Sequence, residues 1–209
     1  MTERFGRDYF YGFKESNYYD YEKMNPSKLF KNVISFIKNQ NIRGKFLDVG
    51  CAFGLLLKEV SPLFNELHGF DISEFAIKKA KQKIPKANLK VVDLEKSLPY
   101  SNESFDCIVA LDVLEHTKNF EKNFEKIVKK LKRGGYLILS VPIDTWLRKF
   151  FGFLDKDKTH ISILKEDKLF QIVKKNKLKV ISKRYFFPLP LIYKIPYIPF
   201  EIELMLKKE

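Results

Sequence analysis

The residues with the most specific chemical pattern are Asp48, Gly50 and Gly54. Asp48 lies within the apolar run at 46–49, and the two glycines lie between this run and a helical segment from Leu55. An apolar run, a tight loop of small residues and a helix start predict a strand, a turn and a helix. Glycine has no Cβ, so the backbone N–H groups at the start of such a helix stay open to a ligand. The pattern predicts a site for a nucleotide-like ligand at the carboxyl end of the strand.

The glycine spacing argues against a dinucleotide. A pyrophosphate-binding loop has the pattern G-x-G-x-x-G, whereas Gly50 and Gly54 are four residues apart with Ala52 between them. The loop is similar to the first motif of the class I S-adenosylmethionine (SAM)-dependent methyltransferases, an acid followed by G-x-G-x-G, with Ala52 in place of the middle glycine. A purely structural turn is the alternative.

Two further apolar runs end in an acid. Asp71 ends the second run and comes roughly 20 residues after Asp48, where nucleotide-binding folds place a ribose-binding acid. Asp93 ends the third run, and in the methyltransferases that the motifs resemble, this acid lies beside the adenine. Capping of the helix predicted at 74–84 is the alternative for Asp71 or Ser73.

The remaining motifs follow in the family's order over residues 44–142. In the segment at 104–116, Asp106 opens a fourth strand, and the resemblance implies that Leu111 and Asp112 face the cofactor at its end. The chain looks like a member of the small-molecule group of the ubiquinone and menaquinone biosynthesis type. The cofactor-binding residues that this resemblance implies are Asp48, Gly50, Cys51, Ala52, Gly54, Asp71, Ile72, Asp93, Leu94 and Leu111.

An amphipathic helix is predicted before the fifth strand. Apolar residues recur at helical spacing over 120–131, and Gly134 and Gly135 can adopt the left-handed conformation that ends a helix. Residues 136–142 then form the expected fifth strand. An earlier helix should begin at Asn25 and Pro26, a cap residue followed by proline.

The resemblance implies an α/β fold, a seven-stranded, mostly parallel, doubly wound Rossmann-like sheet with helices on both faces and the last strand antiparallel. An antiparallel strand pair is expected at 178–187 and 200–206. The chain of 209 residues is long enough for one core. We expect a single domain over 1–209, made of an N-terminal lid and helix (1–40), a cofactor-binding core (41–142), an acceptor-side insertion (143–165) and a C-terminal helix and strand pair (166–209).

Composition limits the classes of partner. Basic residues number 39 and acidic residues 26, which gives a net charge of +13. This charge fits a nucleic acid, an anionic membrane surface or simply solvated helix faces. The two cysteines, Cys51 and Cys107, predict neither a disulfide framework nor a zinc cluster, so no metal site is expected. No secretory leader or membrane-length apolar run is recognised, which predicts a cytoplasmic protein.

Three segments outside the cofactor-binding core are candidates for contact with the acceptor. Seven aromatic residues crowd into 9–21. The resemblance implies that this segment folds as a lid over the cofactor, and a tail packed on the core is the alternative. The stretch 146–154 mixes bulky apolar and basic residues, and 188–199 is apolar and rich in proline. The segment 188–199 connects the two last predicted strands. Three roles are open for so apolar a connection: it covers an apolar acceptor, it contacts a membrane surface, or it packs against the insertion and completes the core.

Methyl transfer from a sulfonium is an in-line displacement that needs positioning and exclusion of water but no covalent residue. A hydroxyl acceptor also needs a base, and His116 and His160 are the candidates. A capping or packing role is the alternative for His116, and His68 is expected to be structural.

We therefore expect a SAM-dependent methyltransferase that acts on a small, apolar or lipid-like molecule. The segment Leu111-Asp112-Val113-Leu114 lacks the Asp/Asn-Pro-Pro-aromatic motif of enzymes that methylate nucleobase amines. An RNA or other nucleic-acid methyltransferase is therefore a weaker alternative. A SAM-binding module without catalysis is the other.

Overall fold

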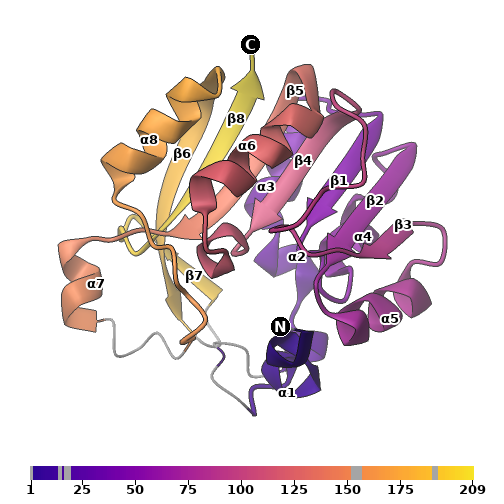
Figure 1. The fold of residues 1–209 in the computed structure, drawn as a ribbon, viewed down its shortest axis with the longest axis horizontal. Helices are drawn as coiled ribbons and strands as arrows, with labels where there is room; N and C mark the ends of the chain where they lie inside the picture. Colours follow the sequence, from indigo (N-terminus) through magenta and orange to yellow (C-terminus); the bar gives the residue numbers. More distant parts are fainter. Residues whose placement is uncertain (1, 14–15, 17–19, 152–156, 190–192) are drawn as a thin grey trace.

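The computed structural model describes residues 2–13, 16, 20–151, 157–189 and 193–209 (Figure 1). The expected lid tyrosines Tyr18 and Tyr19, the end of the apolar stretch at 152–154 and the central part of the proline-rich connection at 190–192 lie outside these residues.

One sheet organises the chain, and its strands run in the order β3-β2-β1-β4-β5-β8-β6-β7. Neighbours from β3 to β5 pair in parallel, whereas β8 is antiparallel to β5 and β6, and β7 is antiparallel to β6. The predicted mostly parallel Rossmann-like sheet is confirmed. The strands are β1 (Lys45–Val49), β2 (Glu66–Asp71), β3 (Asn88–Val91), β4 (Phe105–Leu111), β5 (Leu131–Pro142), β6 (Leu178–Leu189), β7 (Tyr193–Pro196) and β8 (Glu201–Lys208).

The predicted number of seven strands is wrong, because the described residues already form eight strands in the sheet. The additional strand is β7, a short segment of the proline-rich connection that pairs with the end of β6 through Phe186 and Pro196. Proline has no N–H to donate to a neighbouring strand, so it fits a strand at the edge of a sheet. β7 occupies that edge.

Helices cover both faces of the sheet. Buried residues of α3, α4 and α5 form one core cluster, and those of α6 and α8 form another. In Figure 1, α6 and α8 lie on the near face of the strands and α3 lies behind them. The helical elements are η1 (Thr2–Phe5), α1 (Arg7–Phe10), η2 (Tyr21–Lys23), α2 (Pro26–Leu29), α3 (Lys31–Asn39), α4 (Leu55–Val60), α5 (Glu74–Lys83), η3 (Leu114–His116), α6 (Phe120–Lys130), α7 (Trp146–Phe151) and α8 (Glu166–Lys175).

Two predicted helix starts are confirmed by their caps. The Asn25 side chain accepts a hydrogen bond from the Lys28 N–H, and Pro26 opens α2. Ser73 Oγ accepts the Ala76 N–H at 3.1 Å and caps α5. Each cap satisfies a backbone donor that the first turn of a helix leaves without a partner.

The predicted glycine stop after α6 is wrong. The helix ends at Lys130, and Leu131 is already extended and pairs with Phe105 of β4. The N–H groups of Glu103 and Ser104 donate to the carbonyls of Lys129 and Lys130, both at 2.9 Å, and satisfy the last turn in place of a glycine cap. Gly134 does adopt a left-handed φ of 75°, but within β5.

No helix in the described part of the chain combines the length and the apolar character needed to cross a membrane. Cys51 and Cys107 are both buried and carry free thiols.

Candidate functional site

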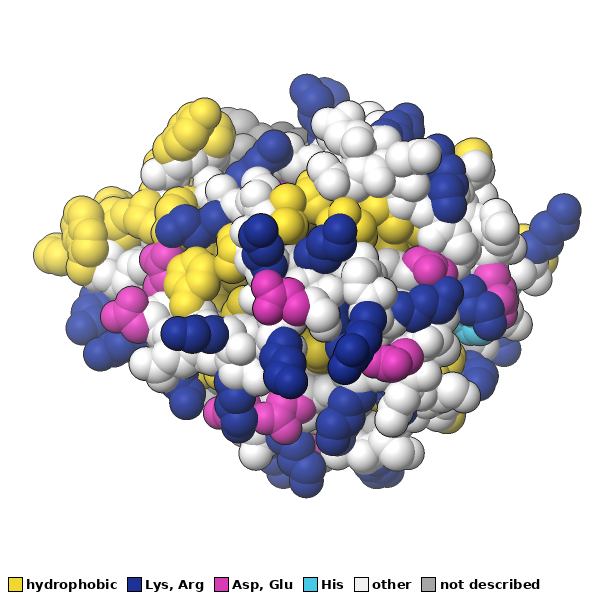
Figure 2. Space-filling view, turned by 90° about the horizontal axis from the view of Figure 1, so that it is seen from above, with side chains coloured by type: hydrophobic (Ala, Val, Ile, Leu, Met, Phe, Trp, Pro, Cys, Tyr) yellow, Lys and Arg dark blue, Asp and Glu magenta, His cyan; other side chains and the backbone are white. Residues whose placement is uncertain are grey.

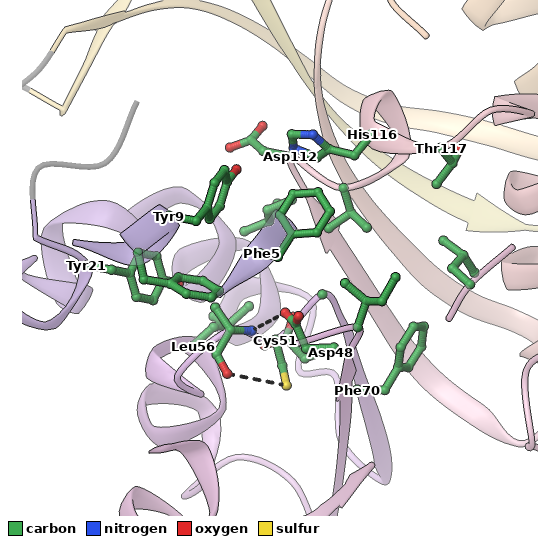
Figure 3. A pocket seen from close by; sticks show the side chains of 18 of the residues that line it. Phe5, Tyr9, Tyr21, Asp48, Cys51, Leu56, Phe70, Asp112, His116 and Thr117 are labelled. Carbon is green, nitrogen blue, oxygen red and sulfur yellow. Dashed lines mark hydrogen bonds between the residues drawn. The ribbon is translucent and has the colours of Figure 1, made fainter. Parts of the chain in front are cut away.

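A cavity of about 280 Å³ lies at the carboxyl ends of the parallel strands. Figure 3 shows Phe5, Tyr9 and Tyr21 of the N-terminal segment on one side of it, and Asp48 and Cys51 on the other. Nine of the ten predicted cofactor-binding residues line the cavity: Asp48, Gly50, Cys51, Ala52, Asp71, Ile72, Asp93, Leu94 and Leu111.

Gly54, the tenth, is not among the described residues that line the cavity. It is the N-cap of α4, with a left-handed φ of 71°, and a Cβ on it would meet Ile84 Cδ1 at 2.8 Å. Gly54 therefore permits the close approach of α4 to α5. Gly50, which does line the cavity, has a φ of 70° and leaves the space in which a Cβ would meet Val113 at 2.4 Å.

Ala52 takes a left-handed conformation that is unusual for a residue with a Cβ. Its φ is 45°, and such a conformation costs roughly 1–2 kcal/mol. The Ala52 N–H donates to Asp71 Oδ2 at 2.9 Å, an interaction that is drawn in Figure 3. Asp71 therefore holds the loop in the conformation that opens it towards the cavity.

The Asp71 carboxylate is buried and binds backbone donors on both oxygens. Oδ1 accepts the Ser73 N–H at 2.9 Å, and Oδ2 accepts the Ala52 N–H. Burial nevertheless raises the pKa of Asp71, although these hydrogen bonds lower it. A carboxylate oxygen has two acceptor sites, so each oxygen can still accept a hydroxyl group of a ribose.

Asp48 lies next to Asp71, and ionisation of its carboxyl is less favourable than ionisation of Asp71. Burial raises its pKa well above the ordinary value, and the neighbouring Asp71 charge raises it further. Burial likewise raises the pKa of Tyr21, and the charge of Asp48 adds to this shift. The base of the cavity is therefore a place where negative charge is already unfavourable.

Asp93 lies in the loop after β3, two positions beyond the last strand residue, Val91. Its Oδ1 accepts the Glu95 N–H at 2.9 Å. Lys126 of α6 donates to the carbonyls of Leu94 and Glu95, both at 2.9 Å. Sequence reasoning did not identify Lys126, because a lysine on a helix face normally indicates solvent exposure.

The N-terminal segment closes the other side of the cavity. Phe10 and Tyr21 are buried against Phe53, with ring centroids 4.8 and 5.4 Å away. Of the expected lid tyrosines in the described residues, Tyr9 and Tyr21 line the cavity, whereas Tyr11 packs outside it against Phe53. The described part of this segment thus packs on the core and also lines the cavity.

The insertion also contributes to the cavity. The N–H groups of Ile161 and Ser162 donate to the Glu115 carbonyl at 2.8 and 3.0 Å, and Ile161 lines the cavity. Tyr9 Oη donates to Asp157 Oδ2 at 2.7 Å and joins the N-terminal segment to the insertion. No described residue of α7 lines the cavity.

The two predicted bases, His116 and His160, lie side by side, but of the two only His116 lines the cavity. His116 lines the cavity, and the ring of His160 stands behind it with a centroid distance of 4.9 Å. Burial lowers the pKa of His116 to about 4, and the neighbouring His160 contributes. A histidine with this pKa is neutral at pH 7 and is a weak base.

Three residues that sequence reasoning did not identify surround these histidines. Thr159 Oγ1 lies 2.7 Å from His116 Nδ1 and donates its hydrogen to Asp157. Glu115 is 1% exposed, and burial together with the Asp112 charge raises its pKa well above the ordinary value. Glu115, His116 and His160 place their potential metal-ligating atoms within 4.8 Å of one another, although the cysteine count had predicted no metal site.

Comparison with known proteins agrees with this arrangement. The model of the family described as "Methyltransferase domain" matches residues 21–183. The mitochondrial ubiquinone biosynthesis O-methyltransferase of Rattus norvegicus is 32% identical over 117 residues, which cover 53% of this chain and 34% of that protein. An uncharacterized protein of Methanocaldococcus jannaschii is 31% identical over 125 residues, which cover 59% of this chain and 57% of that protein. This chain therefore spans only part of the length of these relatives.

A solved structure shares the whole architecture. A SAM-dependent methyltransferase from Archaeoglobus fulgidus matches with a TM-score of 0.71 at 18% identity, over 96% of this chain and 100% of that chain. At this identity the likeness concerns the fold. Because the family model covers more than half of the sequence, the chain belongs to the methyltransferase domain family, with the fold of the class I SAM-dependent methyltransferases and SAM as the cofactor of that class.

Proposed function

We propose that this chain transfers the methyl group of SAM to a hydroxyl group of a small, apolar or lipid-like acceptor and leaves S-adenosylhomocysteine. The observation that carries the proposal is a single cavity that joins the acids at the strand ends to an aromatic wall from the N-terminal segment. The name of the rat relative, a ubiquinone biosynthesis O-methyltransferase, supports an oxygen acceptor.

The acids at the strand ends supply the cofactor side. Asp71 would accept the ribose hydroxyls on its remaining acceptor sites, and Asp93 would meet the exocyclic amine of the adenine. The chain's main task is then to hold the acceptor oxygen in line with the methyl carbon and to keep water out. Phe5, Phe10 and Tyr21 give the cavity the apolar wall that this task requires.

His116 is the predicted base that lies beside the cavity. Its Nδ1 is engaged with Thr159, which leaves Nε2 for other partners. A base with a pKa of about 4 does not by itself remove the proton of a hydroxyl group. We therefore place His116 next to the acceptor oxygen, and a second group must help to polarise the acceptor hydroxyl before it loses its proton.

The nucleic-acid alternative is less well supported. Lys and Arg side chains are scattered over the face shown in Figure 2, with acidic side chains between them and no continuous basic groove. Nucleic-acid sites instead gather basic residues along one face.

A methyltransferase and a SAM-binding module without catalysis differ only in whether a methylated product forms.

The acceptor class can be tested with SAM that carries an isotopic label on its methyl group. Phenols with alkyl tails of increasing length, and total RNA, would be offered as acceptors. We expect label to enter the phenols more readily as the tail lengthens, and Asp71→Ala to abolish this transfer. Label in RNA alone would overturn the acceptor class. Binding of SAM without any methylated product would favour the module without catalysis.

A membrane surface is the partner that we propose for α7. Trp146 and Phe150 are 66% and 73% exposed, and the exposed Lys149 lies between them. Hydrophobic side chains protrude at the left of Figure 2, the side on which α7 lies in Figure 1. An exposed helix that combines aromatic and basic residues suits the interface of an anionic bilayer, from which an apolar acceptor could be collected.

A further inference from the structure

Lys126 of α6 binds a turn that lines the cavity. Its Nζ donates to the carbonyl oxygens of three successive residues, Leu94 and Glu95 at 2.9 Å and Lys96 at 3.2 Å. Nζ also donates to Asn123 Oδ1 at 3.0 Å, one turn earlier on the same helix. We infer that Lys126 is a positioning residue for the adenine of SAM, and that its ammonium sets the selectivity for a base with an exocyclic amine.

The contacts of Lys126 require its charged form. All four partners of Nζ are oxygens that accept, and an ammonium has three hydrogens and no lone pair, so every donor is used. A neutral amine would turn its lone pair towards one of these oxygens. Carbonyl oxygens that converge on one point repel one another, and a positive charge between them offsets this repulsion. The shape of the turn therefore depends on the ammonium.

The turn that Lys126 binds carries part of the cavity wall. Asp93, Leu94 and Glu95 line the cavity, whereas Lys126 is not among the described residues that do so. The Lys96 N–H donates to the Asp93 carbonyl at 3.0 Å and closes the turn. The Glu95 N–H donates to Asp93 Oδ1 at 2.9 Å and orients the carboxylate, whose Oδ2 can accept an N–H from the cavity. Lys126 thus acts on the cavity through the turn.

Lys126 also interacts electrostatically with the carboxylate of Asp93. Burial and the charge of Lys122 lower the pKa of Lys126, whereas the charges of Asp93 and Glu95 raise it. The ammonium therefore lies close enough to Asp93 to attract its carboxylate. An ionised carboxylate accepts a hydrogen bond more strongly than a neutral group does. This arrangement favours a base that presents an N–H donor.

The inference rests on the proposed function, which places the adenine beside Asp93. The exocyclic amine of adenine donates a hydrogen bond, whereas unsubstituted purine has no donor at that position. A site that is built to bind an N–H rejects the analogue without it, because the acceptor of the protein is then left unpaired. Without the ammonium the turn relaxes, Asp93 no longer meets the amine in a fixed geometry, and this selectivity is lost.

Calorimetry on the full chain with two ligands tests the role of Lys126. The first ligand is S-adenosylhomocysteine, and the second is its analogue with unsubstituted purine in place of adenine. We expect the wild type to bind the adenine compound at least about tenfold more tightly, as a hydrogen bond to a charged group allows. Lys126→Met should reduce this ratio to about twofold or less, through weaker binding of the adenine compound, because the oriented hydrogen bond is lost.

The matched control is Lys129→Met, which changes an exposed lysine on the same helix and should keep the wild-type ratio. A folded Lys126→Met variant that keeps this ratio, or that loses both ligands equally, would overturn the positioning role. Thermal unfolding shows whether each variant is folded. If Lys126→Met does not fold, Lys126→Gln decides, because its amide is neutral but still donates two N–H groups. It should show the same reduced ratio.

The wild type separates this inference from the proposed function. Absence of binding of S-adenosylhomocysteine would contradict the cofactor site, and the role of Lys126 with it. Binding of both ligands with equal affinity would leave the cofactor site in place and overturn only the selectivity that we assign to Lys126.

Discussion

Asp48 and Asp71 are neighbouring buried acids with different tasks. Asp71 accepts two backbone N–H groups and fixes the loop. Asp48 is the penultimate residue of β1, and burial together with the Asp71 charge raises its pKa well above the ordinary value. Asp48 is therefore expected to weaken the fold at neutral pH.

Asp48→Asn should stabilise the protein without SAM, and increasingly so as the pH rises. Asp48 has a raised pKa in the folded state, so the folded chain holds a proton that the unfolded chain has already released above about pH 4. The stability of the wild type therefore falls as the pH rises through this range, and the asparagine variant lacks this loss.

Urea unfolding at pH 4.5 and pH 7.5 would measure this difference. Asp167→Asn, which changes an exposed acid at the start of α8, serves as the control. A stability gain from Asp48→Asn that is the same at both pH values would contradict the expected protonation.

The meeting of the acids at the strand ends could be predicted from single residues, whereas for the two predicted bases only the residues could be named and not their contacts. Asp48, Asp71 and Asp93 each follow an apolar run, and the carboxyl ends of parallel strands meet at one edge of a sheet. His116 and Thr159 are 43 positions apart and meet only because the insertion folds back over η3. Nothing in their local sequence indicates this contact.

The N-terminal segment is tied to α5 by one carboxylate. Glu22 accepts from Tyr11 Oη at 2.5 Å and lies 3.3 Å from Lys79 Nζ and 3.5 Å from Lys83 Nζ. The Tyr11 hydrogen bond and the two lysines lower the pKa of Glu22. This stabilising contribution is present above the ordinary carboxyl pKa and is lost as the pH falls through the lowered value.

Glu22→Gln should accelerate the release of SAM by about two- to fivefold. The side chains are about one third exposed, and a pair of this kind contributes roughly 0.2–1 kcal/mol. Stopped-flow measurement of the dissociation rate would test this, with Glu125→Gln on α6 as the control. An unchanged rate would show that the segment does not retain the cofactor.

Helix α7 should mediate binding to anionic vesicles. Trp146→Ser combined with Phe150→Ser removes the two most exposed aromatic residues of α7 and should reduce co-sedimentation several-fold. Val91→Ser is the matched control, because Val91 is a 45% exposed apolar residue at the opposite edge of the sheet. Equal loss in both variants would argue against a role of α7.

The ends of the elements were harder to predict than the elements themselves. Strands β1 and β4 could be predicted because strands buried on both faces are continuously apolar. The end of α6 could not, because its last carbonyls are satisfied by N–H groups of Glu103 and Ser104 in a distant loop. Strand β7 could not be predicted either, because proline has no N–H to donate and normally argues against a strand. At the edge of the sheet this donor is not needed.

The whole-molecule charge of +13 should cause only weak binding to RNA. Basic side chains that are scattered, as on the face shown in Figure 2, attract a polyanion without aligning it, so the binding should disappear as the salt concentration rises. Gel shifts over a salt series would test this. Tight binding that persists at 200 mM salt would instead revive the nucleic-acid alternative, since roughly this concentration weakens purely electrostatic complexes strongly.

Calorimetric titration with SAM tests the central claim, that the cavity between the strand ends and the N-terminal segment holds this cofactor through Asp71. We expect a Kd between about 1 μM and 1 mM for the wild type, the range in which enzymes commonly bind substrates. Asp71→Ala should weaken it at least tenfold, with thermal unfolding as the check that the variant is folded. Absence of binding by the wild type, or equal binding by a folded Asp71→Ala variant, would show that Asp71 does not hold SAM in this cavity.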